Sequence, residues 1–301
     1  MTTAERFSGS LLAVVLADAM GAPYEGGILE KVAWKAISLR RPGTLLYTDD
    51  GDMTIGCLDS LTRCGAFNVA DMAMTWAKRA NAGRGYGGGA IRCLKLIRNG
   101  VPWTEANRRV YPKGSYGNGA AMRVAPLALW SYQKPDQLEA TIRLASSVTH
   151  AHPLGIDGAL LIGRAIAAAL TGADAEAVFD AAAGHDYESP IAQRLKIAEG
   201  LLGQTPDQRP VAESLGNGIV AHESVVTALL IACWFLDQPF EDLVGFCIAV
   251  GGDVDTIAAM SAGIWGAARG IHQLPVKPLA RLEDRDLIET LAQQLHEIVV
   301  G

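Results

Sequence analysis

Residues 154–170 read LGIDGALLIGRAIAAAL, and the spacing of their apolar side chains decides the fold class. Leucine, isoleucine and alanine recur every three or four positions, which is typical of a helix and not of a strand. Asp157 and Arg164 interrupt the apolar run, so it falls short of a membrane-spanning helix. The stretch therefore predicts a core helix in a helical protein.

The same helical spacing runs through most of the chain. Alternating strand patterns are almost absent, and residues 45–48 form the one short β-like candidate. Connections rich in glycine, proline or polar residues do not resemble linkers, so we expect one compact all-α domain of about a dozen helices over residues 1–301. These connections lie at 41–53, 83–89, 110–118, 184–190 and 203–221. Further helices are predicted near 5–20, 54–64, 69–82, 88–98, 119–131, 136–147, 190–201, 223–235, 239–250, 256–268 and 287–298.

The composition limits the classes of partner. Hydrophobic residues make up 50% of the chain and aromatic residues 6%, which suits helices packed closely through alanine, leucine and glycine. A net charge of −6 argues against nucleic acid or an anionic membrane, so a phosphate-bearing ligand must be held by local groups. The five cysteines form no CxxC pair, which indicates buried thiols in a reducing compartment, and no signal peptide is recognisable. We therefore expect a soluble, cytoplasmic monomer.

Two acidic clusters precede apolar helical segments: YTDDGDMT at 47–54 and GGDVDT at 251–256. Carboxylates this close repel one another unless they diverge into solvent or share a cation. An all-oxygen ligand set suits Mg²⁺, Mn²⁺ or Ca²⁺ better than zinc, and two such ions would neutralise four carboxylates. The alternative is that these residues only cap the following helices. The candidate ligands are the carboxylates of Asp49, Asp50, Asp253 and Asp255 and the hydroxyls of Thr48 and Thr256.

Two glycine loops, RGYGGG at 84–89 and GSYGNG at 114–119, run into apolar helices. Glycine lets backbone N–H groups approach a phosphate closely, and a helix N-terminus favours negative charge. Tyr86 and Tyr116 are candidates to stack on a base or a ribose. The alternative is an ordinary turn, since the first loop lacks the strand and the full spacing of a dinucleotide-binding motif.

Four other polar residues are candidates near a site. Glu25, between Tyr24 and two glycines, is a carboxylate that could swing over a site, or simply an exposed glutamate. Asp18 shares a helical stripe with apolar residues, so it should point inward, where it either supports the site or ties two helices together. His150 and His152 lack a third soft ligand, which disfavours zinc; one of them could hydrogen-bond a ligand or a metal-binding carboxylate.

In their order along the chain, these motifs resemble the ADP-ribosylglycohydrolase family. TDDGDM at 48–53 is similar to its first metal motif, and GGDVDTIA at 251–258 to its second. GYG at 85–87, GSYGNGAAMRVA at 114–125, THA at 149–151 and LAQQLH at 291–296 resemble the branch that acts on serine-linked ADP-ribose, poly(ADP-ribose) and O-acetyl-ADP-ribose. Gly51 and Val254 stand where the family usually has threonine, so hydroxyls that could orient carboxylates are missing.

The resemblance implies an orthogonal multi-helix bundle with a dinuclear metal site holding two Mg²⁺, or Mn²⁺ in their place. It implies a hydrolase that cleaves the glycosidic bond between ADP-ribose and a serine, an acetyl group or another ADP-ribose. Hydrolysis of arginine-linked ADP-ribose and binding of ADP-ribose without catalysis are the alternatives. The implied metal ligands are Thr48, Asp49, Asp50, Asp253, Asp255 and Thr256. The implied ADP-ribose groove comprises Gly85, Gly87, Gly114, Ser115, Tyr116, Gly117, Asn118 and His150. The implied catalytic residues are Glu25, Asp49, Asp50, Asp253 and Asp255, with Glu25 as the flap glutamate.

Overall fold

The structure is helical throughout. It is a computed structural model that describes the backbone of residues 1–301 and all side chains except those at positions 29, 30 and 33. Along this backbone no strand forms, and the predicted all-α class is confirmed. Short 3₁₀ turns are η1 (Ala22–Tyr24), η2 (Ala82–Arg84) and η3 (Ile271–Gln273). The α-helices are α1 (Thr3–Gly21), α2 (Ile28–Ser38), α3 (Asp49–Cys64), α4 (Val69–Arg79), α5 (Gly88–Arg98), α6 (Trp103–Val110), α7 (Ala125–Ser131), α8 (Pro135–Ser146), α9 (Pro153–Leu170), α10 (Ala175–Ala183), α11 (Ser189–Leu202), α12 (Gln208–Ser214), α13 (Ala221–Trp234), α14 (Phe240–Val250), α15 (Val254–Arg269), α16 (Val276–Leu279) and α17 (Arg285–Val300).

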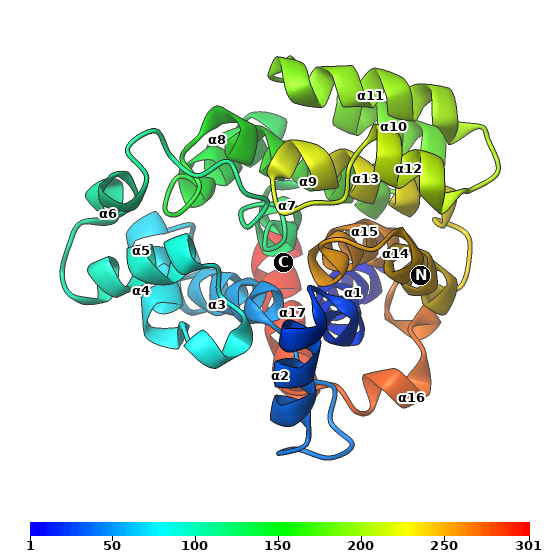
Figure 1. Cartoon of the computed structure of the whole chain (residues 1–301). Coiled ribbons are helices and arrows are strands. Elements are labelled where there is room, and N and C mark those ends of the chain that lie inside the picture. Colours follow the sequence, from blue (N-terminus) through cyan, green and yellow to red (C-terminus); the bar gives the residue numbers. More distant parts are fainter.

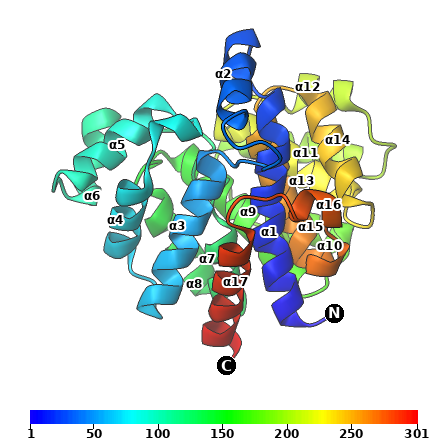
Figure 2. The same ribbon diagram turned by 90° about the horizontal axis from the view of Figure 1, so that it is seen from below.

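Helices α1 and α15 form the centre of the molecule. They lie side by side in Figures 1 and 2, with α3–α6 on one side and α10–α13 on the other. Their backbones approach closely at two glycines, Gly9 and Gly266. A Cβ on Gly9 would lie only 2.6 Å from the Gly266 oxygen, so a larger residue would not fit there. Ser10 donates to the Gly263 oxygen over 2.8 Å at the same contact. Small residues thus let two buried helices share one core.

The C-terminus of α1 abuts the start of α15. A Cβ on Gly21 would lie 2.7 Å from Cα of Asp255, so glycine is required for this contact. The chain then passes through η1 and Glu25 into α2, which projects from the body of the molecule (Figure 2). The second acidic cluster is therefore packed directly against the helix that leads to Glu25.

Several helix boundaries differ from the sequence predictions. Residues 119–124 form turns, and the helix predicted at 119–131 begins only at α7, where Pro126 occupies its first turn. Helix α12 lies inside the predicted connection 203–221, and α2, α6, α10 and α16 were not predicted. The β-like residues 45–48 make only an isolated parallel bridge between Leu45 and Leu282.

Two helical segments are long and apolar enough to cross a membrane by length and composition, Thr3–Tyr24 and Pro153–Leu170. The expectation that residues 154–170 fall short of a spanning helix is therefore wrong by this measure, because Asp157 and Arg164 interrupt the apolar run too little. The apolar windows of the two segments are 83% and 67% buried inside the protein. Core helices show this combination, because an apolar helix that packs on all sides leaves little surface for lipid. Asp157 lies on the buried part of α9, where its carboxylate accepts the N–H of Glu188 over 3.0 Å.

Candidate active site between the two acidic clusters

The two acidic clusters form the first turns of α3 and α15, where the sequence had suggested loops. Thr48 is the N-cap of α3, and its hydroxyl accepts the N–H of Asp50 over 3.3 Å. Before α15, Gly251 and Gly252 have φ values of 72° and 76°, a left-handed conformation that favours glycine. A Cβ on Gly252 would also lie 2.1 Å from the Asn217 oxygen. Backbone constraints therefore fix where Asp253 and Asp255 enter the helix.

The structure brings the two clusters together across about 200 residues of sequence. They line a single cavity of about 270 Å³. Carboxylate oxygens of Glu25, Asp253 and Asp255 lie within 4.8 Å of one another. Glu25 lines the same cavity from the segment after α1. The polar lining residues from the two clusters are Asp49, Asp50, Asp253, Asp255 and Thr256.

Carboxyl groups are crowded in this cavity, so that ionising each of them is unfavourable. Burial, reinforced by the charge of Asp18, raises the pKa of Asp49 from 3.8 to about 8. Burial and neighbouring carboxylates raise the pKa of Asp50 and of Asp255 well above the ordinary value. Burial also raises the pKa of Asp253, although the side chain of Asn118 opposes the shift by donating to its Oδ2 over 2.5 Å. A bound cation would relieve this repulsion.

The residues present fit a divalent metal. Oδ2 of Asp50 is buried and has no hydrogen-bond partner among the described residues, which is costly for a carboxylate oxygen. The surrounding donors are carboxylate and hydroxyl oxygens, the ligands preferred by Mg²⁺, Mn²⁺ and Ca²⁺. This orphaned oxygen therefore makes cation binding a better explanation of the cluster than helix capping alone.

Asp18 holds the first acidic cluster in place through hydrogen bonds. It is fully buried on α1 and accepts the backbone N–H of Thr48 over 3.0 Å and that of Gly51 over 2.8 Å. The Thr48 hydroxyl also donates to it over 2.8 Å, and Thr48 does not line the cavity. Asp18 thus does both things that the sequence left open: it ties α1 to α3 and it orients the loop that carries Asp49 and Asp50.

The departure at position 51 has a structural reason. A Cβ on Gly51 would lie 2.7–2.9 Å from side-chain atoms of Tyr47, so the tyrosine ring fills the space that a threonine would need. Tyr47 is buried, and its hydroxyl donates to Asp284 over 2.6 Å. Val254 is buried at the start of α15, and nothing in the structure explains its choice over threonine.

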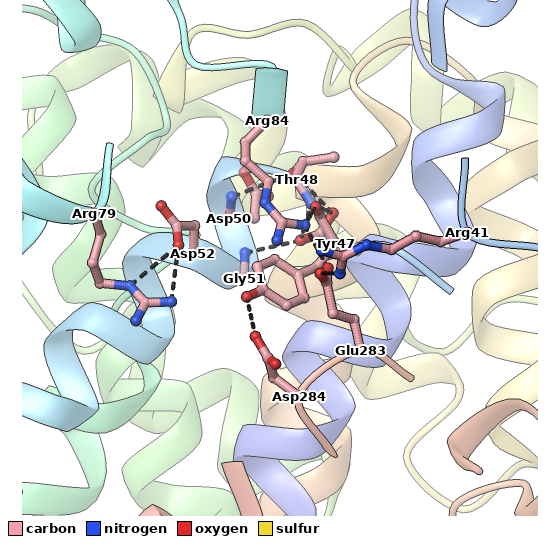
Figure 3. A network of polar contacts seen from close by, with 11 residues as sticks. Arg41, Tyr47, Thr48, Asp50, Gly51, Asp52, Arg79, Arg84, Glu283 and Asp284 are labelled. Carbon is pink, nitrogen blue, oxygen red and sulfur yellow. Dashed lines mark hydrogen bonds and ion pairs between the residues drawn. The ribbon is translucent and has the colours of Figure 1, made fainter. Parts of the chain in front are cut away.

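The first glycine loop is anchored to α3 by a polar network (Figure 3). Arg84 donates to the Tyr47 carbonyl over 2.8 Å, stacks 4.0 Å from the Tyr47 ring centroid, and forms an ion pair with Glu283 at 2.6 Å. Asp52 accepts both Arg79 at 2.9 Å and the hydroxyl of Tyr86 at 2.6 Å. The expectation that Tyr86 stacks on a ligand is therefore wrong, because its ring is buried and its hydroxyl holds the loop in place.

This anchoring leaves the glycines of the first loop facing the acids. Gly85 and Gly87 line the cavity together with Gly88 and Gly89. A Cβ on Gly85 would lie 3.6 Å from Oδ1 of Asp49, so the loop passes directly beside the first cluster. Helix α5 begins at Gly88, which places its N-terminus at the cavity wall.

The second glycine loop is only partly in the site. Ser115, Gly117 and Asn118 line the cavity, whereas Gly114 and Tyr116 do not. Gly114 has a φ of 80°, and a Cβ there would lie 2.3 Å from the His152 nitrogen, so packing requires this glycine. Half of Tyr116 is exposed, and its ring contacts the His152 ring edge-on at 5.7 Å.

The two histidines have separate roles. His150 lines the cavity, and burial lowers its pKa to about 3, which keeps the ring neutral. His152 is the N-cap of α9, where its Nδ1 accepts the N–H of Leu154 over 3.2 Å. The structure thus separates the pair that could have suggested zinc.

The sequence analysis missed part of the cavity wall. Met53 lies one turn after Asp49 on α3, a helical spacing that could have revealed it. Tyr111 packs against Gly89, where a Cβ would lie 2.2 Å from the tyrosine ring, and Ile219 is 69% exposed at the rim. No sequence signal marks these two. Gly88, Gly89 and Gly119 also line the cavity and belong to the two predicted glycine loops. The lining residues that were not predicted are Met53, Ala90, Tyr111, Met122, Thr149 and Ile219.

Comparisons with known proteins identify the family of this chain. The family model of the ADP-ribosylglycohydrolases matches residues 1–300. The chain is 34% identical to a protein of Mus musculus named ADP-ribosylhydrolase ARH3, over 97% of this chain and 91% of that protein. It is 33% identical to the protein of the same name from Homo sapiens, over 97% of this chain and 93% of the other. A solved structure described as an ADP-ribosylglycohydrolase-related protein complex has the same fold, with a TM-score of 0.74, 24% identity and 99% of each chain covered. The chain therefore belongs to the ADP-ribosylglycohydrolase family and is a hydrolase.

Proposed function

We propose that this protein is a divalent-metal-dependent hydrolase that cleaves the glycosidic bond between ADP-ribose and a serine side chain, an acetyl group or another ADP-ribose. The observation that carries the proposal is the unpartnered Oδ2 of Asp50 in a cavity where carboxylates of both acidic clusters meet. The names of the mouse and human relatives support ADP-ribose as the group that is released by hydrolysis. A monomeric state and a cytoplasmic location stay predictions.

The acidic clusters would hold two Mg²⁺ or Mn²⁺ ions. When bound, such ions supply Lewis acidity and lower the pKa of coordinated water. Thr48 would contribute the remaining lone pair of a hydroxyl that already donates to Asp18 and accepts from Asp50. The other proposed ligands are Asp49, Asp50, Asp253, Asp255 and Thr256.

Glu25 is the proposed general acid or base. Its carboxylate lies within 4.8 Å of those of Asp253 and Asp255, and it lines the cavity. It follows η1 on the segment that leads into α2, so its backbone is not part of the α1–α15 core. A proton carrier at the edge of the ligand site can deliver its proton to the leaving oxygen as the glycosidic bond breaks.

The glycine loops are proposed to hold the ADP-ribose. The cavity contains no lysine or arginine among its described lining residues, so the pyrophosphate would bind backbone N–H groups and the N-terminus of α5. Gly85 and Gly87 offer backbone without side-chain obstruction, and Ser115 adds a hydroxyl. The ring of Tyr111 at the cavity wall offers a stacking surface for the base.

The test compares the wild type with Glu25→Gln and Asp50→Asn. ADP-ribose release from serine-linked and arginine-linked peptides and from O-acetyl-ADP-ribose is measured with Mg²⁺ and with chelator. Asp286→Asn is the matched control, because that side chain is 97% exposed at the start of α17. We expect both site variants to lose at least about a hundredfold in turnover on the preferred substrate, and chelator to abolish it.

The same assay separates the alternatives. Preferential release from the arginine-linked peptide would select an arginine hydrolase. ADP-ribose binding without metal-stimulated release would select a non-catalytic binding protein. Undiminished turnover in Glu25→Gln and Asp50→Asn would contradict the proposed site.

A further inference from the structure

Arg123 is a buried cation that the proposed mechanism does not use. It lies in the turn before α7, within GNGAAMRVA at 117–125, and is 1% exposed. Its Cζ lies 4.1 Å from the ring centroid of Trp76. Its hydrogen-bond acceptors are Sδ of Met53, the carbonyl of Ala145 and the hydroxyl of Thr149, none of which is a carboxylate. Burying a charge without an opposite charge is costly, so Arg123 requires a functional or structural reason.

The guanidinium of Arg123 is hydrogen-bonded to one residue of the cavity wall, Thr149. Nη2 of Arg123 donates to Oγ1 of Thr149 over 2.8 Å, and this direction is fixed because a guanidinium carries no acceptor. Burial lowers the pKa of Arg123 only to about 10, so the donor stays charged at neutral pH. The same Oγ1 lies 2.8 Å from Nδ1 of His150.

The position of the proton between Thr149 and His150 follows from what each group can pair with. If Nδ1 donated to Thr149, the buried hydroxyl proton of Thr149 would have no acceptor among the described residues. If Thr149 donates to Nδ1, each of these buried groups is paired, which avoids the cost of an unsatisfied hydroxyl. The neutral ring of His150 then carries its proton on Nε2.

Nε2 of His150 faces two glycines of the cavity wall, Gly117 and Gly119. A Cβ on Gly119 would lie 2.9 Å from this nitrogen and one on Gly117 would lie 3.4 Å away, so both glycines leave its approach open. His150 and both glycines line the cavity. We propose that Arg123, acting through Thr149, fixes His150 in its Nε2–H tautomer and so presents a ring N–H donor to the ADP-ribose. The inference rests on the proposed function for the identity of the ligand.

The test reads the tautomer directly. Long-range ¹H–¹⁵N spectra of the full-length protein at pH 7 distinguish Nδ1–H from Nε2–H, and loss of one signal set in His150→Gln identifies the residue. Spectra and ADP-ribose dissociation constants are compared for wild type, Thr149→Val and Thr149→Ser. Valine keeps the shape of threonine without its hydroxyl, whereas serine keeps the hydroxyl. Arg123→Lys keeps the charge and tests the position of the guanidinium donor, and the Thr149 pair decides the question if that variant does not fold.

We expect the wild-type ring as Nε2–H, a mixed or Nδ1–H ring in Thr149→Val, and Nε2–H again in Thr149→Ser. ADP-ribose affinity should fall about tenfold in the valine variant, the loss expected for one hydrogen bond, and return in the serine variant. Arg123→Lys should also give a mixed ring. A wild-type ring as Nδ1–H, or equal affinity and tautomer in wild type and Thr149→Val, would overturn the inference. Absence of ADP-ribose binding in the wild type would contradict the proposed function, while the spectra would still decide the tautomer.

Discussion

Asp49→Asn should stabilise the ion-free protein and reduce the stabilisation that a divalent ion gives. Burial and the charge of Asp18 raise the pKa of Asp49 from 3.8 to about 8. Between the ordinary pKa and pH 7 the native carboxyl stays protonated over about three pH units, while the unfolded one is ionised. Each unit lowers the free energy of unfolding by about 1.4 kcal/mol, so the cost at pH 7 is about 4 kcal/mol as an upper limit. Asp49 is partly exposed to the cavity, and solvent there reduces the penalty. We expect the variant to stabilise the ion-free protein by about 1–3 kcal/mol.

The sign of the pH dependence follows from the raised pKa. A carboxyl with a higher pKa in the native state binds more protons there than in the unfolded chain, between about pH 4 and pH 8. The free energy of unfolding therefore falls as the pH rises through this window. Ion-free wild type should lose more stability between pH 5 and pH 8 than Asp49→Asn does, because asparagine has no proton to release.

Urea denaturation in EDTA and in Mg²⁺ measures both effects, with Asp286→Asn as the exposed control. Mg²⁺ should raise the free energy of unfolding of the wild type, since it binds the native state, and should do so less for Asp49→Asn. An Asp49→Asn protein that is less stable than wild type in EDTA at pH 7.5 would refute the reasoning. Equal slopes with pH for the two proteins would also refute it.

Two further substitutions test the framework of the site. Tyr86→Phe removes the hydroxyl that donates to Asp52 and should weaken ADP-ribose binding. It should lower the free energy of unfolding by only about 1–2 kcal/mol, because Asp52 keeps its arginine partner. An unchanged dissociation constant for ADP-ribose by calorimetry would contradict this. Gly252→Ala should cost about 3 kcal/mol or more in thermal or urea unfolding, from its left-handed backbone and a 2.1 Å approach to the Asn217 oxygen. Gly245→Ala, in open space on α14, is its control and should cost nothing.

The helical fold was predictable because the period of apolar residues is a local signal. It identified α9 and α15 within a few residues, since long buried helices repeat that period several times. Helix α12 was missed because seven residues between polar loops show too few repeats. Residues 119–124 looked helical because their apolar side chains are buried, yet they form turns around Arg123.

The acidic motifs of the site were also visible in the sequence, because adjacent carboxylates before an apolar helix are unusual. The sequence could not show which neighbours point elsewhere. Tyr86 and Tyr116 look alike in glycine loops, but one binds Asp52 from a buried position and the other lies half exposed beside His152. These orientations depend on contacts between distant segments, such as that of Arg84 with Glu283.

The contact of Gly21 with the backbone of Asp255 separates the two acidic clusters from the segment that carries Glu25. One side of that contact is a fixed frame of three helices, α1, α3 and α15, that carries the carboxylates. On the other side, residues 22–40 extend outward with Glu25 at their base. We expect that exchanging this segment between relatives, with Glu25 kept, changes the preference for the group attached to ADP-ribose and leaves the proposed metal ligands in register.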